Sequence, residues 1–158
     1  MDKWDGYAYE RDQVAAAMAE AAGAKGFEPI VITGDVHANY VWDLKSDWDE
    51  QSNATVYGTE FVGTSISSND DDPVAEEDGF TTECGGRNGN VHNHLYDNYR
   101  GYVLCEVTAE RWESTFRIVP AVLDEEAESL TLASFVVEHG RPGAQVATSC
   151  EEQTPGGG

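Results

Sequence analysis

An alanine-rich segment that leads into a short β-branched run limits most strongly how this chain can fold. Residues 10–22 are dense in alanine and predict a helix, which Gly23 and Gly26 are expected to end. Residues 29–33 are apolar and β-branched, which is typical of a buried strand. Helix, short loop and strand in this order predict an α/β unit. The expected apolar face of the helix consists of Val14, Ala17, Met18 and Ala21.

The later part of the chain indicates antiparallel β-structure. Residues 102–108 and 112–119 are predicted strands joined by a turn at 108–111, which makes a hairpin. Two more strands are predicted at 55–62 and 132–137. The inner face of the second hairpin strand is expected to hold Trp112, Ser114, Phe116 and Ile118 or Val119. An early α/β unit followed by antiparallel strands predicts an α/β fold, as part of a sandwich of two sheets covered by helices.

Three segments carry weaker patterns. Residues 38–48 are ambiguous, and a short helix is one option. Residues 68–90 are rich in Asp, Gly, Asn and Pro, and a stretch this long is either a functional loop or a disordered insert. The polar, glycine-terminated end from residue 148 is expected to fray.

The charge excludes one class of partner. The 158 residues include 30 acidic and 9 basic side chains, for a formal net charge of −21. Nucleic acid as a binding partner is excluded, because phosphate backbones need clustered Lys and Arg. A solvated acidic surface, a high-salt habitat and recruitment of cations to a metal enzyme all stay open as reasons for the acidity.

The sequence predicts no membrane span and, in its first residues, no signal peptide. No stretch approaches the roughly 18 consecutive apolar residues that a spanning helix needs. The first residues, 1–5, lack the basic start and apolar run of a signal peptide. Cys84, Cys105 and Cys150 form neither a disulfide framework nor a CxxC zinc signature. One disulfide bond stays possible in an oxidising compartment, but the sequence does not lead us to infer one.

Asp35 and His37 are the first candidates for chemistry, because they follow a predicted strand directly. Ligand sites in α/β sheets gather beyond the carboxyl ends of strands, and Gly34 lets the backbone turn there. In extended backbone the two side chains would point the same way and could grip one metal ion. The alternative is that Asp35 caps a helix and His37 is an ordinary polar residue.

Other polar residues carry less specific signals. His92 and His94 are also two apart and follow a glycine-rich loop, so they lie either over a site or in solvent. Arg100 would meet a phosphate or pair with a carboxylate. His139 fits a turn, and residues 70–72 form an acidic run that is either solvated or a weak calcium site.

Several motifs, taken in order, resemble one family. They are Trp4-Asp5-Gly6-Tyr7, Thr33-Gly34-Asp35-Val36-His37, Gly58 to Ser68, Arg100-Gly101-Tyr102-Val103 and Ala133 to Gly143. Residues 2–145 are similar to the C-terminal portion of the PhoD-like alkaline phosphatases, a branch of the calcineurin-like metallophosphoesterase fold. Residues 146–158 are expected to be a flexible tail.

The resemblance implies a metal-dependent hydrolase of phosphate monoesters, and of diesters as a further option. It implies an α/β sandwich with metals at the strand ends, and iron and calcium as cofactors, with other divalent metals left open. Asp35 and His37 match the metal-ligand motif and would be catalytic. Near the site, Trp4, Asp5 and Tyr7 match one family segment, while Asn90 and His92 match an Asn-Pro-His motif in which Val91 replaces proline.

The family's other metal ligands lie upstream of the region that this chain matches. The chain is therefore expected to be a fragment, a truncated product or one piece of a split enzyme, with little or no activity alone. Its partners would be a phosphate ester and the missing N-terminal portion, and the resemblance implies a periplasmic or extracellular location. The alternative is an inactive remnant that serves as a structural or binding module. A truncated sandwich should also expose apolar surface and self-associate.

Overall fold

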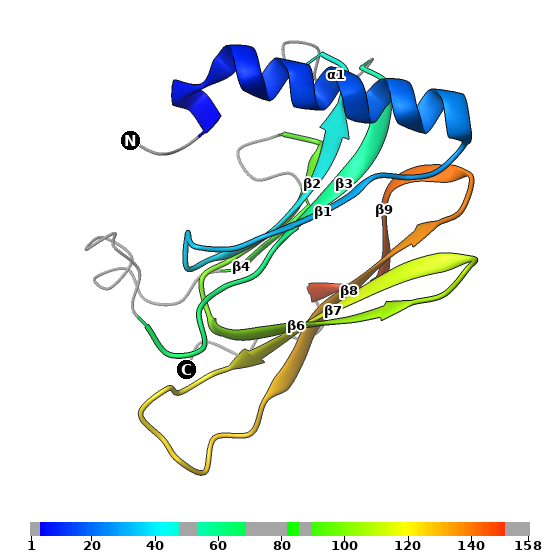
Figure 1. The fold of residues 1–158 in the computed structure, drawn as a ribbon. Helices are drawn as coiled ribbons and strands as arrows, with labels where there is room; N and C mark the ends of the chain where they lie inside the picture. The colour runs from blue at the N-terminus through cyan, green and yellow to red at the C-terminus, as the bar shows by residue number, and fades with distance from the viewer. Residues whose placement is uncertain (1–3, 48–53, 69–81, 86–89, 151–158) are drawn as a thin grey trace.

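The computed structural model describes residues 4–47, 54–68, 82–85 and 90–150, which form two stacked β-sheets and one long helix (Figure 1). A short 3-10 helix, Trp4–Gly6, precedes α1, Ala8–Lys25. The first sheet has the order β1-β3-β2-β5-β4, and the second has the order β6-β7-β8-β9. The first consists of β1 (Ile30–Thr33), β2 (Asn39–Lys45), β3 (Val56–Val62), β4 (Thr82–Cys84) and β5 (Asn93–Asp97). The second consists of β6 (Arg100–Val107), β7 (Arg111–Val119), β8 (Leu130–Glu138) and β9 (Arg141–Thr148).

The hydrophobic core lies between the two sheets, and both sheets contribute to it. Val41, Phe61 and Leu95 from the first sheet pack against apolar residues of β7 and β8. The rings of Phe61 and Phe116 lie 6.4 Å apart, centre to centre, which joins the layers at their middle. The predicted hairpin and its inner face are confirmed, because Ser114, Phe116 and Ile118 are fully buried. The predicted α/β sandwich is confirmed as well.

Helix α1 lies across the outer side of the first sheet, over β3 (Figure 1). It begins and ends a few residues beyond the predicted limits, and Gly26 closes it in the left-handed conformation with φ 65°. None of its residues is fully buried. Of the predicted apolar face, Met18 and Ala21 are half-buried, while Val14 and Ala17 are exposed. The face turned to the sheet is therefore shifted from the predicted one.

Strand β1 differs from its prediction in one respect. It pairs in parallel with β3 at the edge of the first sheet. The prediction of a buried strand is wrong within this chain, because Ile32 is 65% exposed and Thr33 is exposed too. A continuous apolar run normally signals a strand covered on both faces, and in this chain no described strand pairs with the outer edge of β1.

Residues 38–48 and the C-terminal region also differ from the predictions. The ambiguous segment forms strand β2, not a helix. The predicted flexible tail does not begin at residue 146, because β9 extends to Thr148 and Cys150 is buried. Residues 151–158 lie outside the described part, as do the acidic residues 70–72 and most of the predicted loop 68–90. Of that loop, Thr82–Cys84 forms strand β4.

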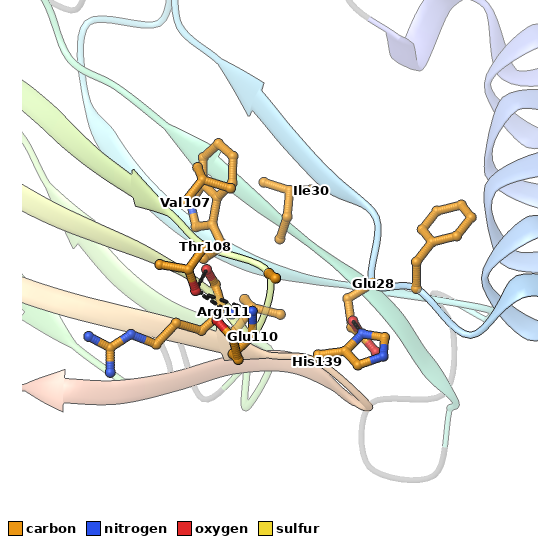
Figure 2. Close-up of a pocket in the computed structure, with 11 residues that line it drawn as sticks. Glu28, Ile30, Val107, Thr108, Glu110, Arg111 and His139 are labelled. Atoms are coloured by element: carbon orange, nitrogen blue, oxygen red, sulfur yellow. Dashed lines mark hydrogen bonds and ion pairs between the residues drawn. The ribbon is translucent and has the colours of Figure 1, made fainter.

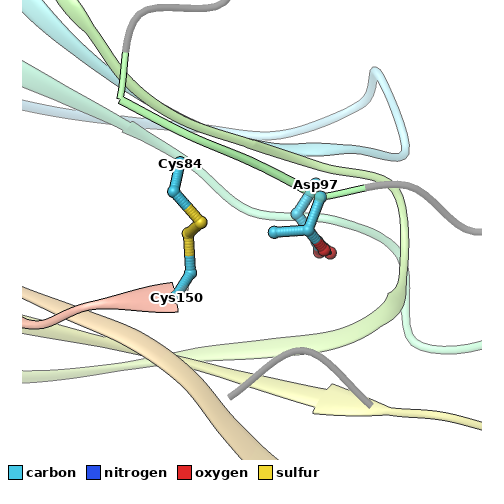
Figure 3. The surroundings of a disulfide bond; sticks show 4 residues. Cys84, Asp97 and Cys150 are labelled. Atoms are coloured by element: carbon cyan, nitrogen blue, oxygen red, sulfur yellow. A yellow bond between two sulfur atoms is a disulfide. The ribbon is translucent and has the colours of Figure 1, made fainter. Parts of the chain in front are cut away.

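A disulfide joins Cys84 of β4 to Cys150 beyond β9 (Figure 3). One bridge was left open from the sequence but was not inferred, and the structure contains it. The two cysteines are 66 residues apart in sequence, with 5.9 Å between their Cα atoms. Sequence spacing could not identify the pair, since sheet packing brings them together. Cys105 is free and exposed. In the described part of the chain, no helix is long and apolar enough to cross a membrane.

Candidate functional site

The loop after β1 holds Asp35 and His37 in an unusual backbone conformation. Asp35 has φ 73° and His37 has φ 56°, so both lie in the left-handed region. The Val36 amide donates a hydrogen bond to the Gly34 carbonyl at 2.9 Å, which tightens the turn. The expected extended backbone is therefore wrong, and the common direction of the two side chains no longer follows from it. Asp35 is exposed and His37 is half-buried, so the carboxylate is open to solvent.

The parallel pairing of β1 and β3 brings a second loop to the same edge. The Gly63 amide donates to the Thr33 carbonyl at 2.9 Å, where both strands end. Figure 1 shows the loop after β1, the segment after β3 and the start of β6 at one end of the sandwich. Thr64 in the second loop thus lies close to the Asp35 loop. The carboxyl ends of parallel strands are where α/β sheets place their ligands.

Arg100, at the start of β6, connects these two loops. Its side chain extends from the second sheet toward the first, and the residue is only 6% exposed. The guanidinium donates to the His37 carbonyl at 2.5 Å and to the Thr64 hydroxyl at 3.3 Å. A guanidinium this deeply buried does not face solvent, so the predicted phosphate contact is not supported. Its charge acts to lower the pKa of the Asp97 carboxyl group, and the alternative of a pairing with a carboxylate stays a prediction.

Asp97 and Asn39 form the buried centre of the same network. They face each other across β2 and β5, and the Asn39 side-chain amide donates to Asp97 at 2.7 Å. The Asn39 side-chain oxygen, Oδ1, accepts a hydrogen bond from the Thr64 backbone amide at 3.0 Å. Burial raises the pKa of Asp97 to about 6, although hydrogen bonds from Asn39 and Thr82 and the charge of Arg100 act to lower it. Neither residue could be identified from the sequence, because a lone polar residue in a strand has no distinctive pattern.

His92 and His94 form a second polar cluster with Asp43 of β2. His92 Nδ1 lies 3.2 Å and His94 Nε2 lies 3.0 Å from the same Asp43 oxygen. Burial acts to raise the pKa of Asp43, but the hydrogen bond and charge of His94, with hydrogen bonds from His92 and Ala144, lower it overall. Asn90 accepts a hydrogen bond from the His92 amide and so begins the turn into β5. The alternative of a solvated His92 is wrong, since it is 7% exposed.

Trp4 and Tyr7 lie beside helix α1. Trp4 lines a hollow of about 200 Å³ with residues of α1, β1, β2 and β3. Tyr7 precedes α1, and its carbonyl accepts a hydrogen bond from the Arg11 amide. Both side chains are about half exposed. The side chain of Asp5 lies outside the described part of the chain. A role for these three residues near the site stays a prediction.

A hollow of about 190 Å³ lies at the start of β1 (Figure 2). His139 Nδ1 lies 3.3 Å from Glu28, and the Gly140 amide donates to the same carboxylate at 2.7 Å. These contacts fasten the β8–β9 turn to the strand entry, in agreement with the turn predicted at His139. The Asp35 loop follows the other end of β1, so this hollow is separate from the candidate metal loop.

The donor set at the Asp35 loop fits part of a metal site. A carboxylate suits calcium and iron, while an imidazole suits iron and other transition metals. Within the described ranges, no three His, Cys, Asp or Glu side chains are grouped to hold one ion. Asp35 and His37 are thus of types that suit such ions, and their role as ligands stays a prediction.

The class of protein to which this two-sheet sandwich belongs follows from its similarity to known phosphatases. A family model described as PhoD-like phosphatase matches residues 1–116. The chain belongs to the PhoD-like phosphatase family.

Two relatives agree with this assignment. Alkaline phosphatase D of Bacillus subtilis (strain 168) is 36% identical over 152 residues, which cover 94% of this chain and 24% of that protein. A solved structure of PhoD superposes with a TM-score of 0.71 at 31% identity, covering 94% of this chain and 27% of that one. The chain thus spans about a quarter of the length of these relatives.

Proposed function

We propose that this chain supplies one part of the active site of a metal-dependent phosphoesterase, which hydrolyses phosphate monoesters and, as a second substrate class, diesters. The observation that carries the proposal is the Gly-Asp-Val-His loop, which the network of Arg100 and Asn39 fastens at the carboxyl edge of β1 and β3. Family membership supports the hydrolase chemistry.

Asp35 and His37 would each give one ligand to a metal centre, with iron and calcium as the proposed ions. Such ions, when bound, supply charge neutralisation for phosphate oxygens and lower the pKa of the attacking water. The exposed Asp35 carboxylate lies at a surface that a substrate can reach. Arg100 is buried, so we assign it no contact with substrate.

The partner that completes the site would be the portion of the enzyme that this chain does not contain. Since the chain spans about a quarter of its relatives, most of their length is available to supply the remaining ligands. We accordingly expect little or no turnover from the chain alone. The partner would be a polypeptide that covers the open edge at β1.

We further propose a location outside the cytoplasm. The Cys84–Cys150 disulfide supports this, because such bonds persist mainly in oxidising compartments. Mass measurement of free thiols in protein isolated from fractionated cells tests the location. Recovery of the chain in the cytoplasm with three free thiols would contradict it.

The test of function combines metal content with hydrolysis of p-nitrophenyl phosphate. Wild type and Asp35→Ala/His37→Ala are each measured alone and after mixing with alkaline phosphatase D of B. subtilis from which the matched region has been deleted. We expect turnover only in the wild-type mixture, at least tenfold above either component. A wild-type mixture that forms a complex and binds iron but hydrolyses nothing would favour the inactive structural module.

A further inference from the structure

We propose that Arg100, Asn39 and Asp97 are positioning residues, which hold the Asp35–His37 loop in the shape that metal binding requires. This inference rests on the proposed function, because it assigns the loop a ligand role. It adds residues from β2, β5 and β6 that touch neither a substrate nor the proposed metal ligands' donor atoms.

The loop backbone is strained and therefore needs support from outside. The left-handed region is unfavourable for a non-glycine residue, and this loop has two such residues within three positions. The hydrogen bond from Val36 to Gly34 is local, and it does not fix the loop relative to the sheet. Arg100 supplies that outside contact through the His37 carbonyl.

The position of Arg100 is in turn determined by buried partners. A buried guanidinium is costly unless its donors are satisfied, and it is compensated here by two acceptors and the nearby Asp97 carboxyl. Asp97 accepts hydrogen bonds from Asn39 at 2.7 Å and from Thr82 at 2.9 Å. Asp97 on β5 is therefore held by partners on β2 and β4, while the partners of Arg100 lie in the two strand-end loops.

The same network sets the distance between the two strand-end loops. Asn39 accepts from the Thr64 amide, and Arg100 donates to the Thr64 side chain. In addition, the Gly101 amide donates to the Ser65 carbonyl at 3.1 Å. Because both loops are tied to one pair of residues, a shift of Arg100 moves both together.

The experiment uses ¹⁵N- and ¹³C-labelled chain studied by NMR without its partner. Arg100→Lys keeps the charge and one donor, Arg100→Ala removes both, and Asn39→Ala removes the bond to Thr64. Arg117→Lys is the matched control, since Arg117 is also part-buried and bonds to Thr131 and Ser129 away from the loop. Guanidinium unfolding of every variant separates loop effects from global loss of fold.

We expect Arg100→Ala to shift the amide signals of residues 34–38 and to speed hydrogen exchange at the Thr64 amide at least tenfold. In Arg100→Lys, the loop signals and the Thr64 exchange rate should both lie between those of wild type and Arg100→Ala. Asn39→Ala should change the exchange rate at Thr64 most. Arg117→Lys should leave all of these signals unchanged. Unchanged loop signals in a folded Arg100→Lys and a folded Asn39→Ala would overturn the proposal. So would equal shifts in Arg117→Lys.

A second readout keeps this proposal separate from the proposed function. Mn²⁺ is titrated into each variant while the His37 ring signals are followed. If Mn²⁺ broadens His37 in wild type, we expect at least threefold weaker binding in Arg100→Ala. If Mn²⁺ leaves His37 unaffected in wild type but the loop still depends on Arg100, positioning stands and the ligand role of His37 in this chain fails.

Discussion

At the scale of single residues, burial of the Asp97 carboxyl group should make the free energy of unfolding depend on pH. Its pKa is raised from 3.8 to about 6 because the carboxyl group is buried. The neutral Asp97 carboxyl group therefore makes its whole contribution to the free energy of unfolding below about pH 3.8. This contribution is lost as the pH rises through about 6. One pKa unit corresponds to about 1.4 kcal/mol, so the loss is on the order of 3 kcal/mol.

Asp97→Asn should remove this pH dependence, because an amide does not ionise. We expect the unfolding free energy of wild type to fall relative to the variant, by on the order of 3 kcal/mol, between pH 4 and pH 7. Urea unfolding at half-unit steps of pH measures it. Asp43→Asn is a useful comparison, since the lowered pKa of Asp43 adds stability above pH 3.8 that is lost on acidification. Parallel pH curves for wild type and Asp97→Asn would contradict the assignment.

The left-handed conformation of Asp35 gives a second test on the same scale. Glycine adopts this conformation without strain, whereas alanine pays for its Cβ. Asp35→Gly should therefore be more stable than Asp35→Ala by about 1 kcal/mol. At the exposed helical position Glu20 the order should reverse, because glycine costs about 1 kcal/mol in a helix interior. Thermal unfolding of the four variants tests this order of stability. If glycine and alanine rank in the same order at both positions, the Asp35 loop is not strained.

At the scale of elements, the pairing of β6 with β7 depends on the absence of a side chain at Gly101. A Cβ built there would lie 1.9 Å from the Arg117 carbonyl oxygen on β7, so the backbone must shift. We expect Gly101→Ala to destabilise the chain by about 2 kcal/mol or more. Gly23→Ala in α1 meets nothing within 4 Å and should stabilise by about 1 kcal/mol. Denaturant unfolding measures the free energy of unfolding of both variants. If Gly101→Ala is as stable as wild type, the hairpin backbone shifts at little cost.

The strands that could be predicted from sequence are those with regular apolar alternation. The sequence predicted the β6–β7 hairpin, β3 and β8, because apolar residues recur along the inner face of each strand. Strand β5, with the sequence Asn93-His94-Leu95-Tyr96-Asp97, was missed because buried polar residues interrupt the pattern. Strand β9 was missed because it contains Pro142 and Gly143, which an edge strand tolerates.

The candidate site was predictable only in part, for a related reason. Asp35 and His37 follow a strand directly, which is a local signal. Arg100 contacts the His37 carbonyl from 63 positions along the chain, and only the stacking of the two sheets makes this pair. The pairing of Asp43 with His92 likewise spans 49 positions. Contacts of this kind arise from tertiary packing and leave no mark on local spacing.

At the scale of the whole molecule, β1 is an edge strand, and no other described strand pairs with its outer side. Ile32 lies on the same face of β1 as Ile30, which packs against the core, yet Ile32 is 65% exposed. An edge strand with unpaired backbone groups and an exposed apolar side chain favours association with another chain. The net charge of −21 opposes association at low ionic strength.

These two effects predict self-association that increases with salt. The screening length falls from about 30 Å at 0.01 M salt to about 3 Å at 1 M, so repulsion fades while apolar contacts persist. We expect the sedimentation coefficient to rise between these salt concentrations, and Ile32→Lys to reduce the rise. Since that change also lowers the net negative charge, less association cannot come from greater repulsion. Leu123→Lys is the control, because Leu123 is fully exposed in the β7–β8 connection, away from β1. Equal effects of the two substitutions would show that general surface hydrophobicity drives association. A monomer at all salt concentrations would show that the exposed β1 edge does not cause self-association.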